Sequence, residues 1–294
     1  MRLLHLSDLH FETLPERLYV GVSSTLNRSW RELRVLDPDL VLVSGDLTSY
    51  GAWDQGQLRG VKRWLDSMDA SYVALPGNHD LGASVDRGFK FPVIEYYESV
   101  EWSRTNFARV FEQQPVVSKL VGGVEVIAVA LRDRDPDGAL DQLEAVLSGS
   151  EGPALVAGHY PISPVRECGV LANFGSEGFI GSALERLRSL VLGSERVAAY
   201  LCGHVHAASV LPLSDRVLQF SAGALGPGPS CGWLIDFSDD QLSWDLVAGS
   251  GPQTFWSGEQ LDGADPADYH LGPSSTWRGS ISFVRRPRRS RLGT

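Results

Sequence analysis

The sequence has few cysteines, no long apolar run and a deficit of basic side chains. Its three cysteines, Cys168, Cys202 and Cys231, lie far apart among 294 residues. This spacing excludes a disulfide framework and a cysteine-rich zinc site. No apolar run reaches the roughly 18 residues of a membrane-spanning helix. The first residues show no apolar stretch followed by a small-residue cleavage site, so we expect no signal peptide and a cytoplasmic protein.

Basic residues are outnumbered, with 26 lysines and arginines against 36 acidic residues, and the net charge is −10. Proteins that bind nucleic acids need a basic surface for phosphate contacts, so a nucleic-acid partner is disfavoured. Five arginines nevertheless cluster between Arg285 and Arg291. We interpret them as part of a disordered tail, with binding of an anionic partner as the alternative. The hydrophobic fraction of 43% is ordinary for a folded domain.

Short apolar runs alternate with amphipathic stretches, which predicts a layered α/β fold. Strands are expected at residues 3–6, 40–43, 72–75, 124–130, 154–157 and 198–201. Helices are expected at residues 24–36, 58–68, 139–147 and 179–192. Three consecutive antiparallel strands are expected at residues 217–221, 231–237 and 241–247. The pattern then fades, so we predict one domain over residues 1–248 and an irregular appendage over 249–294.

Five short polar motifs follow predicted strands. They are Asp8-Leu9-His10, Gly45-Asp46, Gly77-Asn78-His79-Asp80, Gly158-His159 and Gly203-His204-Val205-His206. Of the seven histidines, only His5 and His270 lie outside these motifs. Side chains at the carboxyl ends of adjacent strands converge in an open α/β sheet. Carboxylate, imidazole and amide groups suit first-row metal ions, so the pattern predicts a metal site without thiolate ligands.

The order of the motifs resembles that of the calcineurin-like metallophosphoesterase superfamily. The family pattern is Asp-x-His, Gly-Asp, Gly-Asn-His-Asp/Glu, a lone His and Gly-His-x-His, and every part is present from Asp8 to His206. The resemblance implies a four-layer α/β/β/α sandwich of two mixed β-sheets flanked by helices. It also implies a metal-dependent phosphoric ester hydrolase with a dinuclear centre. Manganese is the favoured metal, and iron and zinc are the alternatives.

The resemblance assigns seven metal ligands. One ion would be held by Asp8, His10 and His206. The second ion would be held by Asn78, His159 and His204, and Asp46 would bridge the two. Two ions held by a bridging carboxylate lie about 3.5–4 Å apart, and a hydroxide between them would attack phosphorus.

His79 is expected to be a catalytic residue rather than a ligand. The resemblance places its imidazole over the leaving group, where it would donate a proton or a hydrogen bond to the departing oxygen. Asp80 would then hold the imidazole in the required tautomer. The alternative for Asp80 is a helix N-cap.

Several other polar residues have ordinary structural interpretations. His5 lies among apolar neighbours and is expected to be packed or hydrogen-bonded, whereas His270 is expected to be solvated. Cys202 is expected to be a small buried hydrophobe. The run from Arg132 to Asp135 is interpreted as a solvated loop, with a substrate-phosphate contact as the alternative. The aromatic stretch 81–114 is either a rim over the site or the core of a helical insertion.

Weaker features resemble the bacterial class III cyclic nucleotide phosphodiesterases. They are the opening from His5 to Phe11, Arg132-Asp133 with the following helix, and His159-Tyr160-Pro161, in which Tyr160 replaces the second histidine of the subgroup. This resemblance covers residues 2–247 and implies a small, cyclic nucleotide phosphodiester as substrate.

Two alternatives remain open for the function. One is a DNA or RNA nuclease of the same superfamily, although only 47 residues follow Val247, where such enzymes add a cap domain. The other is a catalytically silent protein-binding scaffold, which retention of all seven ligand types disfavours. The oligomeric state is left open.

Overall fold

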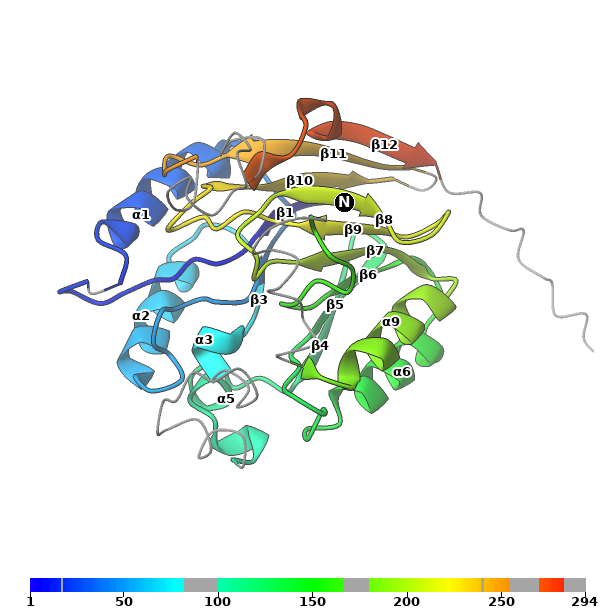
Figure 1. Ribbon diagram of the computed structural model, residues 1–294, viewed down its shortest axis with the longest axis horizontal. Helices are drawn as coiled ribbons and strands as arrows, with labels where there is room; N and C mark the ends of the chain where they lie inside the picture. The colour runs from blue at the N-terminus through cyan, green and yellow to red at the C-terminus, as the bar shows by residue number, and fades with distance from the viewer. Residues whose placement is uncertain (17, 82–99, 167–179, 239–240, 254–269, 283–294) are drawn as a thin grey trace, which may run out of the picture.

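Two mixed β-sheets stack face to face, and helices cover the outer face of each (Figure 1). This arrangement confirms the predicted four-layer α/β/β/α sandwich. The computed structural model describes residues 1–16, 18–81, 100–166, 180–238, 241–253 and 270–282. Within the described ranges, no helix combines the length and the apolar composition that crossing a membrane requires.

The first sheet has the strand order β12-β11-β10-β1-β2-β3. Its strands are β1 (Arg2–Leu6), β2 (Leu40–Ser44), β3 (Tyr72–Leu75), β10 (Cys231–Phe237), β11 (Gln241–Ala248) and β12 (Arg278–Ser282). β1, β2 and β3 run parallel, and β10, β11 and β12 are joined by antiparallel pairs. Leu3 packs into the core between the sheets, and its neighbour Leu4 packs into the core under the helices. Burial on both faces explains why β1, β2 and β3 read as continuous apolar runs.

The second sheet has the order β4-β5-β6-β7-β9-β8. Its strands are β4 (Val116–Val121), β5 (Val124–Val129), β6 (Ala154–Ala157), β7 (Val197–Cys202), β8 (Ser209–Pro212) and β9 (Leu218–Ser221). The expected run of consecutive antiparallel strands from residue 217 is wrong at β9. This strand lies parallel to β7, while β10 joins the other sheet beside β1. A fully buried apolar run carries no information about its pairing partner, which explains the error.

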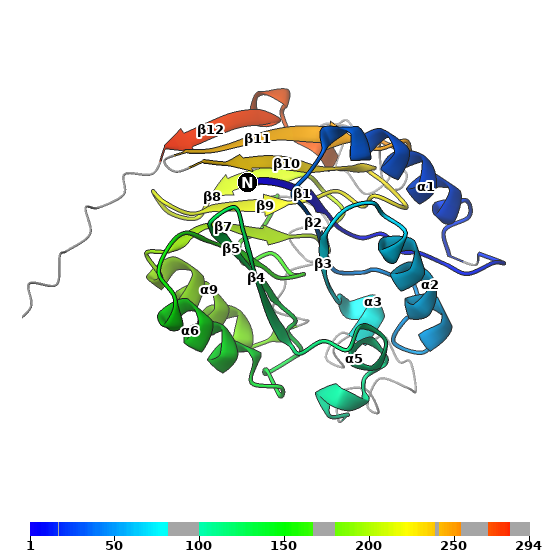
Figure 2. The ribbon, with the colours of Figure 1, turned by 180° about the vertical axis from the view of Figure 1, so that it is seen from behind.

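Helices pack on the outer faces of both sheets (Figure 2). Those on the first sheet are α1 (Val22–Leu33), α2 (Gln55–Asp66) and α5 (Asn106–Phe111). Those on the second sheet are α6 (Ala139–Gly149) and α9 (Ala183–Gly193). The short helix α3 (Asn78–Leu81) follows β3, and single 3₁₀ turns lie at Arg34–Leu36, Trp102–Arg104 and Ser274–Thr276.

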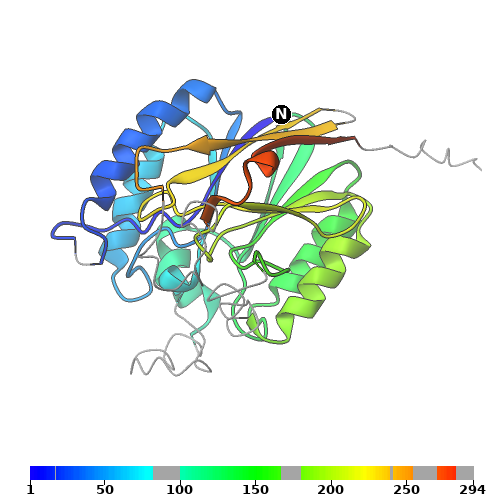
Figure 3. The same cartoon turned by 45° about the horizontal axis from the view of Figure 1, so that its top comes forward.

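The region after β11 is not irregular throughout, contrary to the sequence-based expectation. β12 pairs with β11 and extends the first sheet at its edge (Figure 3). His270 is also buried rather than solvated, since it is 4% exposed and its Nδ1 lies 3.2 Å from the carbonyl oxygen of His206. The sequence did not predict β12, because its residues Arg278, Gly279 and Ser280 do not alternate between apolar and polar side chains as in a typical strand. The arginine cluster lies outside the described residues, and the division at residue 248 stays a prediction.

Candidate metal centre

The five motifs meet at the carboxyl ends of parallel strands from both sheets. Three of them follow β1, β2 and β3 of the first sheet, and two follow β6 and β7 of the second. The loop after β1 joins the two sheets there, because the His204 amide donates to Asp8 Oδ2 at 3.0 Å. The Asp8 amide in turn donates to the Gly45 carbonyl at 3.0 Å. The sandwich thus brings together groups that are about 200 residues apart in the sequence.

Much of the site's backbone has a positive φ, the left-handed region that side chains other than glycine rarely adopt. The values are 52° at Asp8, 45° at His10, 46° at Asp46, 71° at His204 and 49° at His206. These are five of the nine non-glycine residues with positive φ in the described part of the chain. Each such residue costs on the order of 1–3 kcal/mol and persists only where its surroundings hold it. The strain is therefore concentrated on the candidate ligands.

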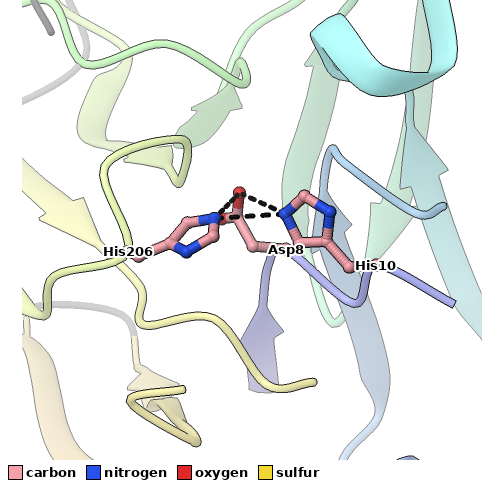
Figure 4. Close-up of side chains that lie close together, drawn as sticks. All are labelled: Asp8, His10 and His206. Carbon is pink, nitrogen blue, oxygen red and sulfur yellow. Dashed lines mark hydrogen bonds and ion pairs between the residues drawn. The ribbon is translucent and has the colours of Figure 1, made fainter. Parts of the chain in front are cut away.

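Asp8, His10 and His206 form what we term the first subsite (Figure 4). The two Nε2 atoms of His10 and His206 lie 3.1 Å apart. Asp8 Oδ1 lies 3.3 Å from the Nε2 of His206 and 4.0 Å from that of His10. Burial, together with the nearby His79, lowers the pKa of His10 well below its usual value. His10 is therefore neutral, which is the form of imidazole that binds metals.

Asn78, His159 and His204 form the second subsite. Asn78 Oδ1 lies 3.2 Å from His159 Nε2 and 3.0 Å from His204 Nδ1. His159 Nδ1 donates to the carbonyl oxygen of Ser44 at 2.9 Å. This bond places one ring proton on Nδ1, so that Nε2 is the nitrogen that faces the site and would bind a metal once it is deprotonated, as in most metal-binding histidines.

Asp46 lies between the two subsites. Its Oδ2 is 3.8 Å from His10 Nε2 and 3.4 Å from His159 Nε2, and its Oδ1 accepts the His79 amide at 2.8 Å. Burial would raise the pKa of Asp46, but the imidazoles of His159 and His79 hold it well below its usual range. Burial likewise would lower the pKa of His159, but the Asp46 carboxylate raises it to about 9. The ionised Asp46 carboxylate thus stabilises positive charge in its surroundings, which would favour a bound cation.

The donors of this site fit metal ions. Asp8 Oδ1 is buried and makes no hydrogen bond within the described part of the chain, although two imidazole nitrogens face it. The full donor set is two carboxylates, one amide oxygen and four imidazoles. Such a set suits divalent or trivalent first-row ions. In the described part of the chain, three groups have donor atoms within 4.8 Å of one another: Asp8, His10 and His206; Asp46, His159 and His204; and His10, Asp46 and His79.

His79 stands beside the first subsite. Its ring centroid is 4.8 Å from that of His10, with the planes at 80°. Its Nδ1 lies 2.9 Å from the carbonyl oxygen of Ser49. A carbonyl only accepts hydrogen bonds, so Nδ1 carries a proton and Nε2 is the nitrogen that remains for chemistry.

Asp80 does not hold the His79 imidazole, which corrects the expectation for this residue. Its carboxylate accepts the amides of Leu47 at 2.8 Å, Thr48 at 3.1 Å and Gly77 at 3.0 Å, as well as the Thr48 hydroxyl at 2.7 Å. Burial and the neighbouring Asp46 raise the pKa of Asp80 to about 6. Asp80 therefore ties together the loops after β2 and β3. The bond back to Gly77 is of the capping-box kind, from the third residue of α3.

The structural roles expected for the polar residues outside the motifs are confirmed for His5 and Cys202 and wrong for Arg132. His5 is buried and its Nε2 lies 2.8 Å from Ser44 Oγ, and Cys202 is buried, both as expected. Arg132 is not solvated: it is 8% exposed, and its guanidinium donates to Asp137 at 2.7 Å and to the carbonyl of Val100 at 2.9 Å. It therefore braces the loop after β5. Of the aromatic stretch, residues 82–99 lie outside the described part of the chain.

Two aromatic residues contact the site without having been assigned to it from the sequence. Tyr160 packs edge-on against both His159 and His204, with ring centroids 5.0 Å apart in each case. Its only signal was its position directly after His159. Tyr19 packs against His10, with ring centroids 5.0 Å apart. It lies nine residues after His10 in the loop between β1 and α1, outside the five motifs.

The fold and this site define a metal-dependent phosphoric ester hydrolase. The chain belongs to the calcineurin-like phosphoesterase family, whose model matches residues 1–208. It is similar to a probable glycerophosphodiester phosphodiesterase, GpdQ, of Arcobacter nitrofigilis. The two are 25% identical over 272 residues, which cover 88% of this chain and 90% of the relative.

Solved structures share the fold at low sequence identity. A dimetal phosphatase from Danio rerio is 14% identical, with a TM-score of 0.58, over 84% of this chain and 96% of its own. Purple acid phosphatase PPD1 from yellow lupin is also 14% identical, with a TM-score of 0.59, over 84% of this chain and 51% of its own. These likenesses establish the architecture and leave the substrate to be argued from the site.

Proposed function

We propose that this protein hydrolyses one ester bond of a small phosphodiester with the help of two metal ions. The observation that carries the proposal is the gathering of six suitable ligand side chains around Asp46, with His79 beside them. The relative named as a probable glycerophosphodiester phosphodiesterase supports diester chemistry, because the match extends over most of both chains.

Each side chain has a part in the proposed reaction. Asp8, His10 and His206 would hold one ion, Asn78, His159 and His204 the other, and Asp46 both. When bound, such ions supply Lewis acidity and a nucleophile at neutral pH.

His79, in its protonated form, would donate from Nε2 to the leaving oxygen. The Ser49 carbonyl, which accepts from Nδ1, keeps the ring in the orientation that this transfer needs. Asp80 would act through the backbone, since it holds the loops that carry Asp46 and His79.

Two substrate classes are candidates. A glycerophosphodiester is favoured by the relative whose sequence aligns with 88% of the chain. A cyclic nucleotide is favoured by the local motifs, among them His159-Tyr160-Pro161. Both contain a phosphodiester with an alkoxide leaving group, which departs poorly without a proton and therefore needs a residue such as His79.

A substrate panel tests the proposal. The manganese-loaded protein would be offered a glycerophosphodiester, a 3′,5′-cyclic nucleotide, a phosphomonoester and single-stranded DNA at equal concentration. We expect kcat/KM to be highest for one of the two small diesters. A preference for the monoester would contradict the proposal, and a preference for DNA would favour the nuclease alternative. Two bound ions without any turnover would favour the scaffold alternative.

A further inference from the structure

The loop between β1 and α1 carries an aromatic residue to the first subsite. The Tyr19 ring lies edge-on to His10, with centroids 5.0 Å apart and planes at 67°. His79 borders the same imidazole at 4.8 Å. Because Tyr19 and His79 both border one candidate ligand, a molecule bound at the first subsite would lie close to both.

Carboxylates fix the backbone of this loop. Glu12 is 1% exposed, and its Oε1 accepts the amides of Leu18 and Tyr19, each at 3.1 Å. Glu16 accepts the Ser23 amide at 2.9 Å where the loop enters α1. Hydrogen bonds to an ionised group are about twice as strong as neutral ones. Tyr19 is thus held in place before any ligand arrives, which reduces the entropy lost on binding.

The Tyr19 side chain can act as a hydrogen-bond donor beside the first subsite. Its ring is half-buried and packs against His10. A phenol hydroxyl carries its proton at neutral pH and can donate it in a hydrogen bond. The oxygens of a phosphodiester are anionic acceptors, which suit such a donor.

We infer that Tyr19 is a substrate-binding residue, whose hydroxyl donates a hydrogen bond to a phosphoryl oxygen of the molecule held at the first subsite. This inference rests on the proposed function and extends it by one residue outside the five motifs. No bond is broken at Tyr19. The Tyr19 hydroxyl would donate its hydrogen bond to an oxygen whose negative charge grows in the transition state. A donor that is already in position there lowers the activation barrier of hydrolysis.

The test compares Tyr19→Phe with a matched control, Tyr72→Phe. The Tyr72 hydroxyl donates to Asp66 at 2.6 Å in an exposed pair away from the site. In the manganese-loaded protein, Tyr19→Phe is expected to lower kcat/KM for bis(p-nitrophenyl) phosphate by roughly 10- to 100-fold, the range for a hydrogen bond to a charged group. Metal content and thermal midpoint should match the wild type. Tyr72→Phe should leave kcat/KM unchanged.

A second measurement separates this inference from the proposed function. Inorganic phosphate is titrated into the manganese-loaded proteins by calorimetry, and we expect about tenfold weaker binding to Tyr19→Phe, as for the loss of one such hydrogen bond. If phosphate binding depends on Tyr19 but no diester is hydrolysed, the proposed function fails and the role of Tyr19 stands. If the wild type and Tyr19→Phe bind phosphate equally well, or if neither binds it measurably, the proposed role of Tyr19 is wrong.

Tyr19→Leu checks whether the ring alone matters. Phenylalanine keeps the edge-on contact with His10, and leucine removes it. If Tyr19→Phe behaves as wild type while Tyr19→Leu is impaired, Tyr19 acts by packing and the inference is wrong. Loss of metal from Tyr19→Phe would also overturn it, because the hydroxyl would then act on the ligands rather than on the substrate.

Discussion

The first and second subsites share Asp46 but differ in charge and in how the fold holds them. The first adds a carboxylate of its own, Asp8, whereas the second adds the neutral amide of Asn78. The second is held more closely, since His159 is bonded to the Ser44 carbonyl and Asn78 Oδ1 faces two imidazoles. The two subsites therefore differ in what favours a cation. In the first subsite it is the negative charge of Asp8, and in the second it is the hydrogen bonds that hold the donor side chains in position before a metal binds.

Glycines beside the second subsite show how closely its side chains pack. A Cβ atom at Gly77 would lie 2.2 Å from Asp46 Oδ1 and 2.7 Å from His159 Nε2. A Cβ atom at Gly45 would lie 2.3 Å from His159 Nδ1, and Gly45 also has a φ of 103°. The two glycines are therefore needed for the close approach of His159 and Asp46.

Asp46→Asn should have the largest effect, because it acts on both subsites. We expect metal affinity to fall at least about 100-fold, beyond the range for residues that only support a ligand, and hydrolysis to be lost at micromolar metal. Metal content would be measured by elemental analysis after dialysis. Wild-type metal content and turnover in this variant would show that Asp46 does not bridge the subsites.

His79→Ala tests the region beside the first subsite and removes none of the seven proposed ligands. Positioned acid catalysis contributes roughly 10²- to 10⁴-fold, and mostly for poor leaving groups. We expect turnover to fall by that factor for an alkoxide leaving group and much less for a nitrophenolate, with both ions retained. Equal losses on the two substrates would argue that His79 positions the phosphate instead. A loss of metal would make His79 a ligand.

Asp8→Asn and Asn78→Ala separate the two subsites directly. Asp8→Asn removes a charge that only the first subsite has, and Asn78→Ala removes a neutral donor. Each should weaken the binding of one ion per chain by more than the roughly 10- to 100-fold typical of residues that only support a ligand, and the larger change is expected for Asp8→Asn. Calorimetric metal titration would resolve the two steps. A larger effect of Asn78→Ala would reverse our ranking of charge over geometry.

Gly77→Ala tests the packing of the second subsite, with Gly149→Ala as a matched control. A Cβ atom at Gly149 would meet nothing within 4 Å. We expect Gly77→Ala to cost on the order of 1–3 kcal/mol in the free energy of unfolding and to weaken the second ion. Gly149→Ala should leave metal content unchanged in the same melting and titration experiments. If the two variants behave alike, close packing is not what holds the second subsite.

The layers and the convergence of the candidate ligands were predictable because the strands and the motifs that follow them are visible in the local sequence. β3, β6 and β10 have the expected bounds, since each is an apolar run that ends at a glycine, a proline or a polar residue. The motifs follow such runs directly, so their convergence follows from the fold class.

Features that depend on distant partners were not predictable. β9 lies beside β7 rather than β10, and β12 is an edge strand without an apolar pattern. Asp80 bonds to the loop after β2, which lies more than 30 residues earlier in the chain. His270 reaches the His206 carbonyl from the far end of the chain. Each depends on a long-range contact that periodicity does not encode.

The central claim is that two metal ions, held by these seven side chains, are needed for phosphodiester hydrolysis. The most direct test strips the protein with a chelator, measures metal content and turnover of the best small diester together, and then titrates in Mn²⁺. We expect no turnover in the stripped protein and full recovery as the metal content approaches two ions per chain. Full turnover by the metal-free protein would contradict it, as would complete recovery at one ion per chain.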